Sequence, residues 1–202
     1  MLNSKERFRA NLVQVAELGS LHDHLVGTVT MPNAFDDLLR SQLVYGVSAF
    51  DKLVHDLIRI GMVQTFVGAR PATPKYLSEG IQLRSLTLLS AGSIPPPEFA
   101  FEQIVRDKLS HLSFQDPAKL ADGLGYIWPD GQKWQVLAAA LGMPDEAART
   151  RLRLLATRRN AIVHEADLDP ITHVKQPITK QEVLDALTFL QNLGIKICDC
   201  VM

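Results

Sequence analysis

Apolar residues recur at every third or fourth position along most of the chain, which is the spacing of a helix with one buried face. The clearest stretch covers about residues 34–67. Its apolar positions are Leu39, Leu43, Val47, Phe50, Val54 and Leu57. This stretch predicts one long helix that forms the central rod of the molecule.

Similar patterns predict further helices on both sides of the long one. They cover about residues 4–26, 76–91, 97–112, 144–164 and 179–201, with two short helices after residues 116 and 130. Loops are expected at 68–75, at the proline-rich stretch 92–98 and at 165–177.

Several of these helices carry signals for their ends. Ser4 is a plausible N-cap of the first helix, and Asp116 caps a short helix that opens with a proline. Gly142 ends the next short helix. Thr179 and Glu182 are three residues apart and form a capping box at the start of the last helix.

No strand-type alternation of apolar and polar residues persists for more than a few positions. We therefore expect an all-α protein, an antiparallel helical bundle in one domain over residues 1–202, with a smaller helical insertion at about 68–143. Hydrophobic residues make up 47% of the chain, which is enough for a real core. The net charge of −1 argues against a general polyanion-binding surface, so any nucleic-acid contact needs a local basic cluster.

The two cysteines and the hydropathy pattern bear on location. Cys198 and Cys200 cannot by themselves supply the four ligands of a tetrahedral metal site, and no cluster of further cysteines or histidines lies near them in sequence. Two thiols without a disulfide framework fit a reducing cytoplasm. The opening segment "MLNSKERFRAN" lacks an apolar stretch, and no run approaches the ~18 apolar residues of a membrane span.

Common catalytic signatures are missing, because the chain has no G-x-x-x-x-G-K-[ST], G-x-G-x-x-G, G-x-S-x-G or H-E-x-x-H. Among the six histidines, His22 and His24 are two positions apart and diverge on a helix, so they cannot chelate one metal together. We expect both to be exposed polar positions. His173 lies in a loop, and nothing marks it out.

An adjacent His55 and Asp56 lie within the long helix. Such a pair is the kernel of HD-type metal phosphohydrolases, which need further His and Asp ligands from other helices. The alternative is a buried or interfacial polar pair. Asp51, His55 and Arg59 follow at steps of four, which is the spacing of an ordinary charged stripe.

An arginine and a histidine five positions apart occur twice, as Arg106 with His111 and as Arg159 with His164. Counted over three allowed spacings of Arg and His, composition alone predicts about one match, so the context decides between the two. The second lies in an arginine-rich helix, which contains Arg149, Arg151, Arg153, Arg158 and Arg159. This local density suits contacts with phosphates.

Asn160 and His164 are four residues apart and share a helix face, toward which the long side chain of Arg159 can swing. Metal-free RNA cleavage needs such groups. An imidazole with a pKa near ~6.5 can take a proton from the 2′-hydroxyl or give one to the 5′-oxygen, and a guanidinium can hold the phosphate oxygens. The alternative is structural, because Arg and His in a last helical turn also complement the helix dipole.

The segment "RRNAIVHEADLD" resembles the signature of the HEPN superfamily, in which Arg, a polar residue and three further residues precede His. The stretches "LVYGVSAFDKLVHDLIRIGM", "LSHLSFQDPAKLADGLGYIW" and "ITKQEVLDALTFLQNL" resemble the RiboL-PSP-HEPN branch. The resemblance covers about residues 34–200. It implies an all-α bundle that dimerises with its two motifs facing each other.

Many members of this superfamily are metal-independent endoribonucleases that act as toxins or against phage. By resemblance, His164 is the general acid or base, Arg159 the phosphate ligand and Asn160 the positioning group, and Arg158 and Arg153 are candidates for substrate binding. We expect a cytoplasmic dimeric endoribonuclease with no metal or cofactor, with RNA as substrate and an antitoxin as a candidate partner. The alternatives are a non-catalytic HEPN module that mediates dimerisation or binds a partner protein, and the HD-type hydrolase.

Overall fold

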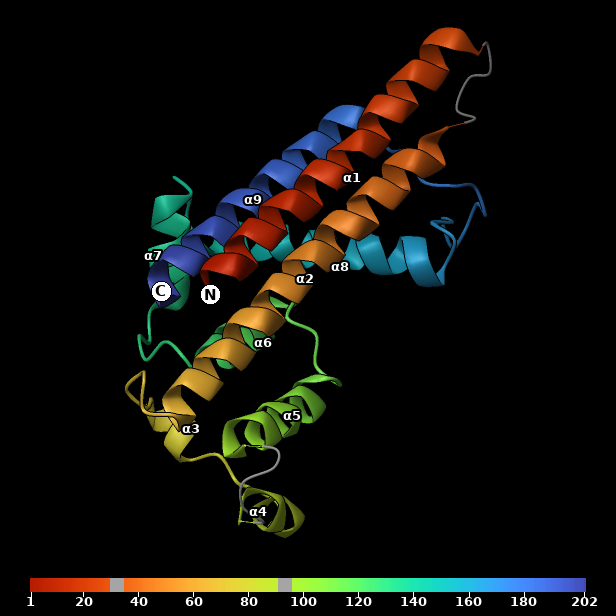
Figure 1. Ribbon diagram of the computed structural model, residues 1–202. Coiled ribbons are helices and arrows are strands. Elements are labelled where there is room, and N and C mark those ends of the chain that lie inside the picture. The colour runs from red at the N-terminus through yellow and green to blue at the C-terminus, as the bar shows by residue number, and fades with distance from the viewer. Residues whose placement is uncertain (30–34, 91–95) are drawn as a thin grey trace.

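The computed structural model describes residues 1–29, 35–90 and 96–202. These residues form an all-α molecule (Figure 1). The helices of the described residues are α1 (Leu2–Thr28), α2 (Asp36–Phe66), α3 (Pro74–Leu77), α4 (Leu83–Ser90), α5 (Pro97–Leu109), α6 (Pro117–Leu124), α7 (Lys133–Ala140), α8 (Asp145–His164) and α9 (Lys180–Val201). Within these ranges the only β-type pairing is an isolated bridge between Leu168 and Lys175. The predicted fold class is confirmed.

Three long helices form the centre of the bundle. Figure 1 shows α1 running antiparallel to both α2 and α9, with the two chain ends close together at one end of the bundle. Lys5 near the start of α1 pairs with Asp199 near the end of α9 at 2.6 Å, which joins the two ends. The long helix predicted at 34–67 is confirmed as α2, and residue 34 lies outside the described residues.

Glycines allow α9 to approach its neighbours closely. A Cβ atom on Gly46 of α2 would lie 2.2 Å from Leu187 Cδ2, and one on Gly194 of α9 would lie 2.6 Å from Phe8 Cε1 of α1. Both contacts are shorter than real Cβ contacts, so only glycine fits without a shift of the neighbour. The central packing therefore depends on these two positions.

Most of the predicted helix ends are confirmed. The side chain of Asp116 accepts hydrogen bonds from the backbone N–H groups of Ala118 and Lys119, and Thr179 forms the full capping box with Glu182. Gly142 follows α7 with φ of 67°, in the left-handed region that ends a helix.

Two sequence predictions about helix ends are wrong. Ser4 is not an N-cap, because α1 begins at Leu2 and the backbone N–H of Ser4 already bonds to the carbonyl of Met1. The single helix expected at 76–91 is two helices, α3 and α4, and residue 91 lies outside the described residues. The first of them starts early because the side chain of Thr73 caps it ahead of Pro74.

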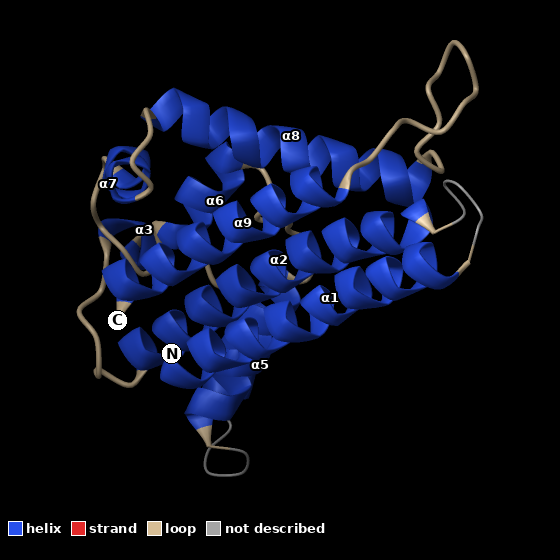
Figure 2. Ribbon diagram, turned by 90° about the horizontal axis from the view of Figure 1, so that it is seen from above, coloured by secondary structure: helices blue, strands red, loops and turns tan. Residues whose placement is uncertain are grey.

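Helix α8 lies across the side of α2 and α9 that is opposite α1 (Figure 2). Only Ala148 and Leu152 of this helix are buried. Leu155 and Ile162 are half-buried against the core, whereas Val163 is 45% exposed. A helix with so narrow a buried face keeps most of its polar side chains available.

The segment of residues 68–143 contains α3 to α7 and covers the second half of α2 and the start of α8 (Figures 1 and 2). Trp134 of α7 donates from Nε1 to the carbonyl of Pro117 at 3.0 Å and joins α7 to α6. Asp51 of α2 accepts a hydrogen bond from the backbone N–H of Phe114 at 2.7 Å and fixes the turn that precedes α6. None of the helices in the described ranges meets the length and hydropathy needed to cross a bilayer.

Candidate functional site

The predicted motif occupies the last two turns of α8. Asn160 and His164 are both exposed and lie one turn apart on the same side of the helix. Arg159 is half-buried, and its position is rotated by about 100° around the α8 axis from that of Asn160. His164 is the final residue of α8, so its imidazole lies where the helix gives way to the loop that leads to α9.

Arg159 and Asn160 are in direct contact. The guanidinium of Arg159 donates from Nη1 to Asn160 Oδ1 at 3.1 Å. Its Nε is buried and has no hydrogen-bond partner within the described ranges. An uncommitted guanidinium that is partly removed from water can gain free energy from an anionic ligand, because the ligand replaces lost hydration.

Both side chains line a cleft of about 410 Å³ between α8, α2 and the start of α6. The lining residues are Asp51, Ser113, Gln115, Asp116, Lys119, Ala156, Arg159 and Asn160. The sequence placed Asp51 in a charged stripe without a role, and it did not single out Lys119. A lone lysine on a short helix carries no local signal, since only the fold places it opposite α8.

The carboxylates of this cleft are already engaged. Asp51 Oδ1 accepts the bond from Phe114, and Asp51 Oδ2 lies 3.8 Å from His55 Nε2. Asp116 Oδ1 accepts the two capping hydrogen bonds of α6. The aromatic ring of Phe114 meets the His55 ring edge-on at 4.7 Å between centroids. Asp51 and His55 of α2 thus contact Phe114 and fix the turn that forms this wall of the cleft.

Arg158 has different surroundings from its neighbour Arg159. It donates to Asp167 Oδ2 at 2.9 Å, to the carbonyl of Pro177 at 3.0 Å and to the side chain of Gln176. Asp167 is fully buried and also accepts from Arg40 Nε of α2 at 2.6 Å. The donors of Arg158 therefore hold the 165–177 loop against α8 and do not face the cleft.

Arg153 lies two turns before Asn160 and lines a second cleft of about 380 Å³. This cleft is walled by α6, α7 and the first half of α8. Its lining residues are Pro117, Ala118, Ala121, Gly131, Lys133, Trp134, Arg149 and Arg153. The residues expected to bind substrate are therefore divided between this cleft, the first cleft and the buried network around Asp167.

His164 lies outside both clefts and forms no side-chain hydrogen bond within the described part of the chain. It is exposed to solvent and is not packed against apolar side chains. One chain thus brings Arg159 and Asn160 together and presents His164 one turn further along the same helix.

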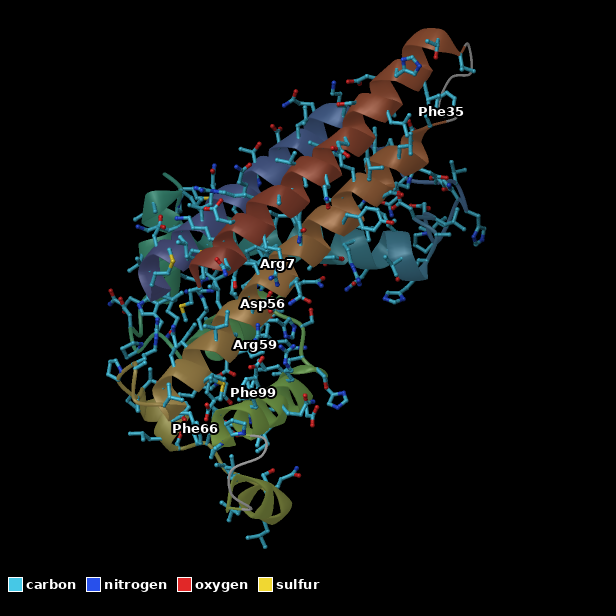
Figure 3. All side chains as sticks on the ribbon, viewed as in Figure 1. Arg7, Phe35, Asp56, Arg59, Phe66 and Phe99 are labelled. Atoms are coloured by element: carbon cyan, nitrogen blue, oxygen red, sulfur yellow. The ribbon has the colours of Figure 1, made fainter. Side chains whose placement is uncertain are left out.

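His55 and Asp56 have different partners. His55 lies 3.8 Å from Asp51, whereas Asp56 lies in a cluster of salt bridges. Asp56 is buried and lies 2.5 Å from Lys52, 3.2 Å from Arg59 and 3.8 Å from Arg7 of α1. Figure 3 labels Arg7, Asp56 and Arg59 where α1 meets α2. Burial acts to raise the pKa of Asp56, but the hydrogen bonds from Lys52 and Arg59 outweigh it and lower the pKa. Three cations around one carboxylate oppose the binding of a further cation.

The remaining histidines do not complete a metal site with this pair. Among the described residues, no group of three or more His, Cys, Asp or Glu side chains is arranged to hold a metal ion. His22 was expected to be exposed, but its side chain is only 12% exposed and lies 3.7 Å from Asp23 and 4.0 Å from Asp36. It faces the helix that starts at Asp36 and not the cluster around Asp56.

The second Arg-x4-His match has a different structural context. Arg106 lies on α5, and its guanidinium is held by Glu102 at 2.6 Å. His111 follows in the turn after the helix and is exposed. The same spacing thus places an arginine that pairs with a carboxylate on α5 and an arginine without a carboxylate partner among the described residues on α8.

An all-α bundle that presents Arg, Asn and His on the last turns of its penultimate helix has the organisation expected of a HEPN domain. The model of the RiboL-PSP-HEPN family matches residues 13–202, and the chain belongs to this family. HEPN domains are often ribonucleases, and they commonly bind RNA and dimerise. Comparison with curated proteins and with solved structures gave no match.

Proposed function

We propose that this protein is a metal-independent endoribonuclease of the HEPN type, with an active site assembled from two copies of the chain. The observation that carries the proposal is the guanidinium of Arg159. It lines a cleft, contacts Asn160 and pairs with no carboxylate of the described residues, one turn before the exposed His164. A cation, an amide and an imidazole on one helix end are the groups that phosphodiester cleavage needs.

In the proposed reaction, the 2′-oxygen of a ribose attacks the adjacent phosphorus, and its proton passes to an imidazole that acts as general base. The bond from phosphorus to the 5′-oxygen breaks, and this oxygen takes a proton from an imidazolium. The products are a 2′,3′-cyclic phosphate and a 5′-hydroxyl. Arg159 stabilises the charge that develops on the non-bridging oxygens, and Asn160 holds Arg159 in place.

The reaction needs one group that accepts a proton and another that gives one, whereas each chain has one histidine in the motif. A two-fold dimer with its α8 ends together supplies His164 from each copy. The exposed position of His164 at the end of α8 supports this arrangement, because a second chain can reach it.

We place this activity in a toxin–antitoxin or anti-phage setting, which the family resemblance supports. A ribonuclease that cleaves RNA with little sequence specificity also cleaves the RNA of its host unless a partner inhibits it. Expression of the wild-type chain should therefore slow host growth, and expression of His164→Ala should not. Equal growth of both strains contradicts this setting.

The catalytic proposal is tested by incubating a mixed RNA with the purified protein in EDTA. We expect cleavage that leaves 2′,3′-cyclic phosphate ends, and we expect Arg159→Ala and His164→Ala to abolish it. The matched controls are Arg106→Ala and His111→Ala, which remove the same residue types at the same spacing on α5 and should retain activity. Cleavage that EDTA and His55→Ala both abolish would instead support the HD-type alternative.

The composite site is tested with a heterodimer of wild-type and His164→Ala chains, purified through two different tags. If both imidazoles serve one site, the heterodimer is nearly as inactive as the homodimer of His164→Ala chains. A heterodimer with half of the wild-type activity shows that each chain works alone. A stable dimer in which neither the wild type nor the variants cleave RNA favours the non-catalytic HEPN module.

A further inference from the structure

The two clefts beside α8 are neighbours along the helix. Both are walled on one side by residues 116–121 of α6 and its cap, and on the other by residues 149–160 of α8. Figure 2 shows α6 and α7 beside the first half of α8. We refer to the combined feature as the α6–α8 groove. Its α6 and α7 walls come from the 68–143 segment.

The groove follows a single stripe of α8. Arg149, Arg153, Asn160 and His164 are separated by four, seven and four residues, which are nearly whole helical turns, so they lie in one row. The row from Arg149 to Asn160 is about 16 Å long at ~1.5 Å per residue. A ligand that lies along it contacts the groove at more than one point.

Four cations of the groove have no ion-pair partner among the described residues: Lys119, Lys133, Arg153 and Arg159. Arg149 pairs with Asp145, and the carboxylates of Asp51 and Asp116 also line the first cleft, where they accept hydrogen bonds from backbone N–H groups. In contrast, the cations beside α5 are matched: Arg59 and Arg106 share Glu102, and Lys108 pairs with Glu79. In a protein of net charge −1, unmatched cations in one groove are an electrostatic footprint for an anion.

Lys133 is one cation of the groove that is partly removed from water. Its ammonium donates to the backbone carbonyl of Asp130 and faces the Trp128 ring at 5.8 Å. Burial lowers the pKa of Lys133, although the charge of Asp130 acts in the opposite direction. An anion in the groove relieves this cost, because it stabilises the charged form of the lysine.

The aromatic side chain of the groove is not available for stacking on bases. Trp134 is 3% exposed, and the guanidinium of Arg149 covers its ring at 5.9 Å from the centroid. The groove therefore offers cations to a sugar-phosphate backbone and no exposed ring to a base. Contacts of this kind position a strand and add affinity, but they do not read its sequence.

We infer that the α6–α8 groove binds the phosphate backbone of single-stranded RNA next to the scissile bond. This inference rests on the proposed function, since it takes the phosphate at Arg159 as the point of cleavage. Phosphates beyond that point run past Lys119 toward Arg153 and Lys133. The 68–143 segment thus supplies the second wall of the substrate track, and the groove lengthens the RNA that the enzyme holds.

Binding is measured by fluorescence anisotropy with a labelled RNA of about 16 nucleotides, in the His164→Ala background so that the RNA stays intact. The test variant is Lys119→Glu/Arg153→Glu, because both side chains are exposed. The matched control is Arg9→Glu/Lys180→Glu, which changes the net charge equally on exposed positions of α1 and α9. Circular dichroism and thermal unfolding verify that both variants fold.

We expect the groove variant to bind the RNA at least about tenfold more weakly and the control to remain within about twofold of the parent. The slope of log K against log salt should fall by about 1.4, since each phosphate contact to a single strand contributes about 0.7. The milder Lys119→Gln/Arg153→Gln variant should show a smaller loss in the same direction. Equal effects in the groove and control variants overturn the inference.

The outcomes separate this inference from the proposed function. If the wild type fails to cleave RNA but binding depends on the groove, the groove is a binding site and the catalytic proposal is wrong. If the wild type cleaves RNA through Arg159 and His164 but the groove variant binds like the control, the catalytic proposal stands and the groove inference is overturned.

Discussion

Arg158 Nη2 lies 2.9 Å from Asp167 Oδ2, and this ion pair joins the last turns of α8 to the loop that leads to α9. Arg40 of α2 reaches the same oxygen at 2.6 Å, so two guanidiniums share one fully buried carboxylate. Asp167 has φ of 60° and so lies in the left-handed region. The pair fixes the end of α8 from which Arg159 and His164 project.

Loss of this carboxylate should strongly destabilise the fold. Asp167→Ala removes the buried partner of Arg40 and of the half-buried Arg158, and it leaves Arg40 only the exposed carboxylate of Asp37. We expect the free energy of unfolding in urea to fall by about 3–5 kcal/mol, the cost of breaking a buried ion pair. The control is Lys180→Ala, which removes an exposed pair with Asp23 and should change the free energy of unfolding far less, because solvent screens exposed ion pairs. Similar midpoints for the two variants contradict the role given to Asp167.

Asp51 should stabilise the turn that forms the cleft wall. Asp51→Ala removes the charged acceptor of the Phe114 N–H, and we expect a loss of about 1.5–3 kcal/mol in the free energy of unfolding. The amide of Phe114 should exchange with deuterium faster in this variant. Asp51→Asn keeps a side-chain oxygen and should recover part of the protection. Unchanged exchange at Phe114 in Asp51→Ala argues against this bond.

The cluster around Asp56 should make stability depend on acid pH. Burial acts to raise the pKa of Asp56, but hydrogen bonds from Lys52 and Arg59 hold it below the ordinary value of 3.8. A pKa that is lower in the folded state means that ionised Asp56 stabilises the fold above about pH 4. This contribution is lost as the pH falls through the folded-state pKa.

Asp56→Asn is the variant that isolates this effect. The wild type should be more stable than the variant near neutral pH, and the difference in unfolding free energy should shrink steadily below about pH 4. Asp185→Asn, on the exposed face of α9, serves as the control and should differ from the wild type by less than about 0.5 kcal/mol near neutral pH. A difference for Asp56→Asn that grows in acid contradicts the assignment.

The two cysteines should differ in reactivity. Cys198 is fully buried, and burial raises the pKa of its thiol to about 11, so little reactive thiolate exists at neutral pH. Cys200 is half-buried and accessible in part. We expect iodoacetamide to label Cys200 in the native protein and Cys198 only after unfolding in guanidinium, as read by mass spectrometry. Native labelling that persists in Cys200→Ser contradicts this order.

The elements that the sequence predicted well are those with local signals. The period of apolar residues placed α2 and α8 within a few residues of their observed ends, and the capping box of Thr179 marked the start of α9. The errors arose where tertiary context decides. Nothing within a few residues of Ser4 shows that the carbonyl of Met1 already accepts its N–H, or that the side chain of Thr73 starts a helix early.

The candidate site shows the same division. The motif residues Arg159, Asn160 and His164 are read directly from the chain, and so is the family resemblance that singles them out from Arg106 and His111. The sequence does not distinguish Arg158 from Arg159, because adjacent residues of the same type have the same local pattern. They diverge by about 100° on the helix, so one meets the buried Asp167 and the other lines the cleft.

By itself, the sequence determined the helical class, the long central helix, the helix ends at Asp116, Gly142 and Thr179 and the motif at the end of α8, because these depend on spacings of a few residues. Only the tertiary structure decided which cations are free and which are neutralised. Lys119 and Arg159 are forty positions apart in the chain, yet they line one cleft. Charge balance at a site depends on neighbours in space, and those neighbours come from helices that the local pattern does not place.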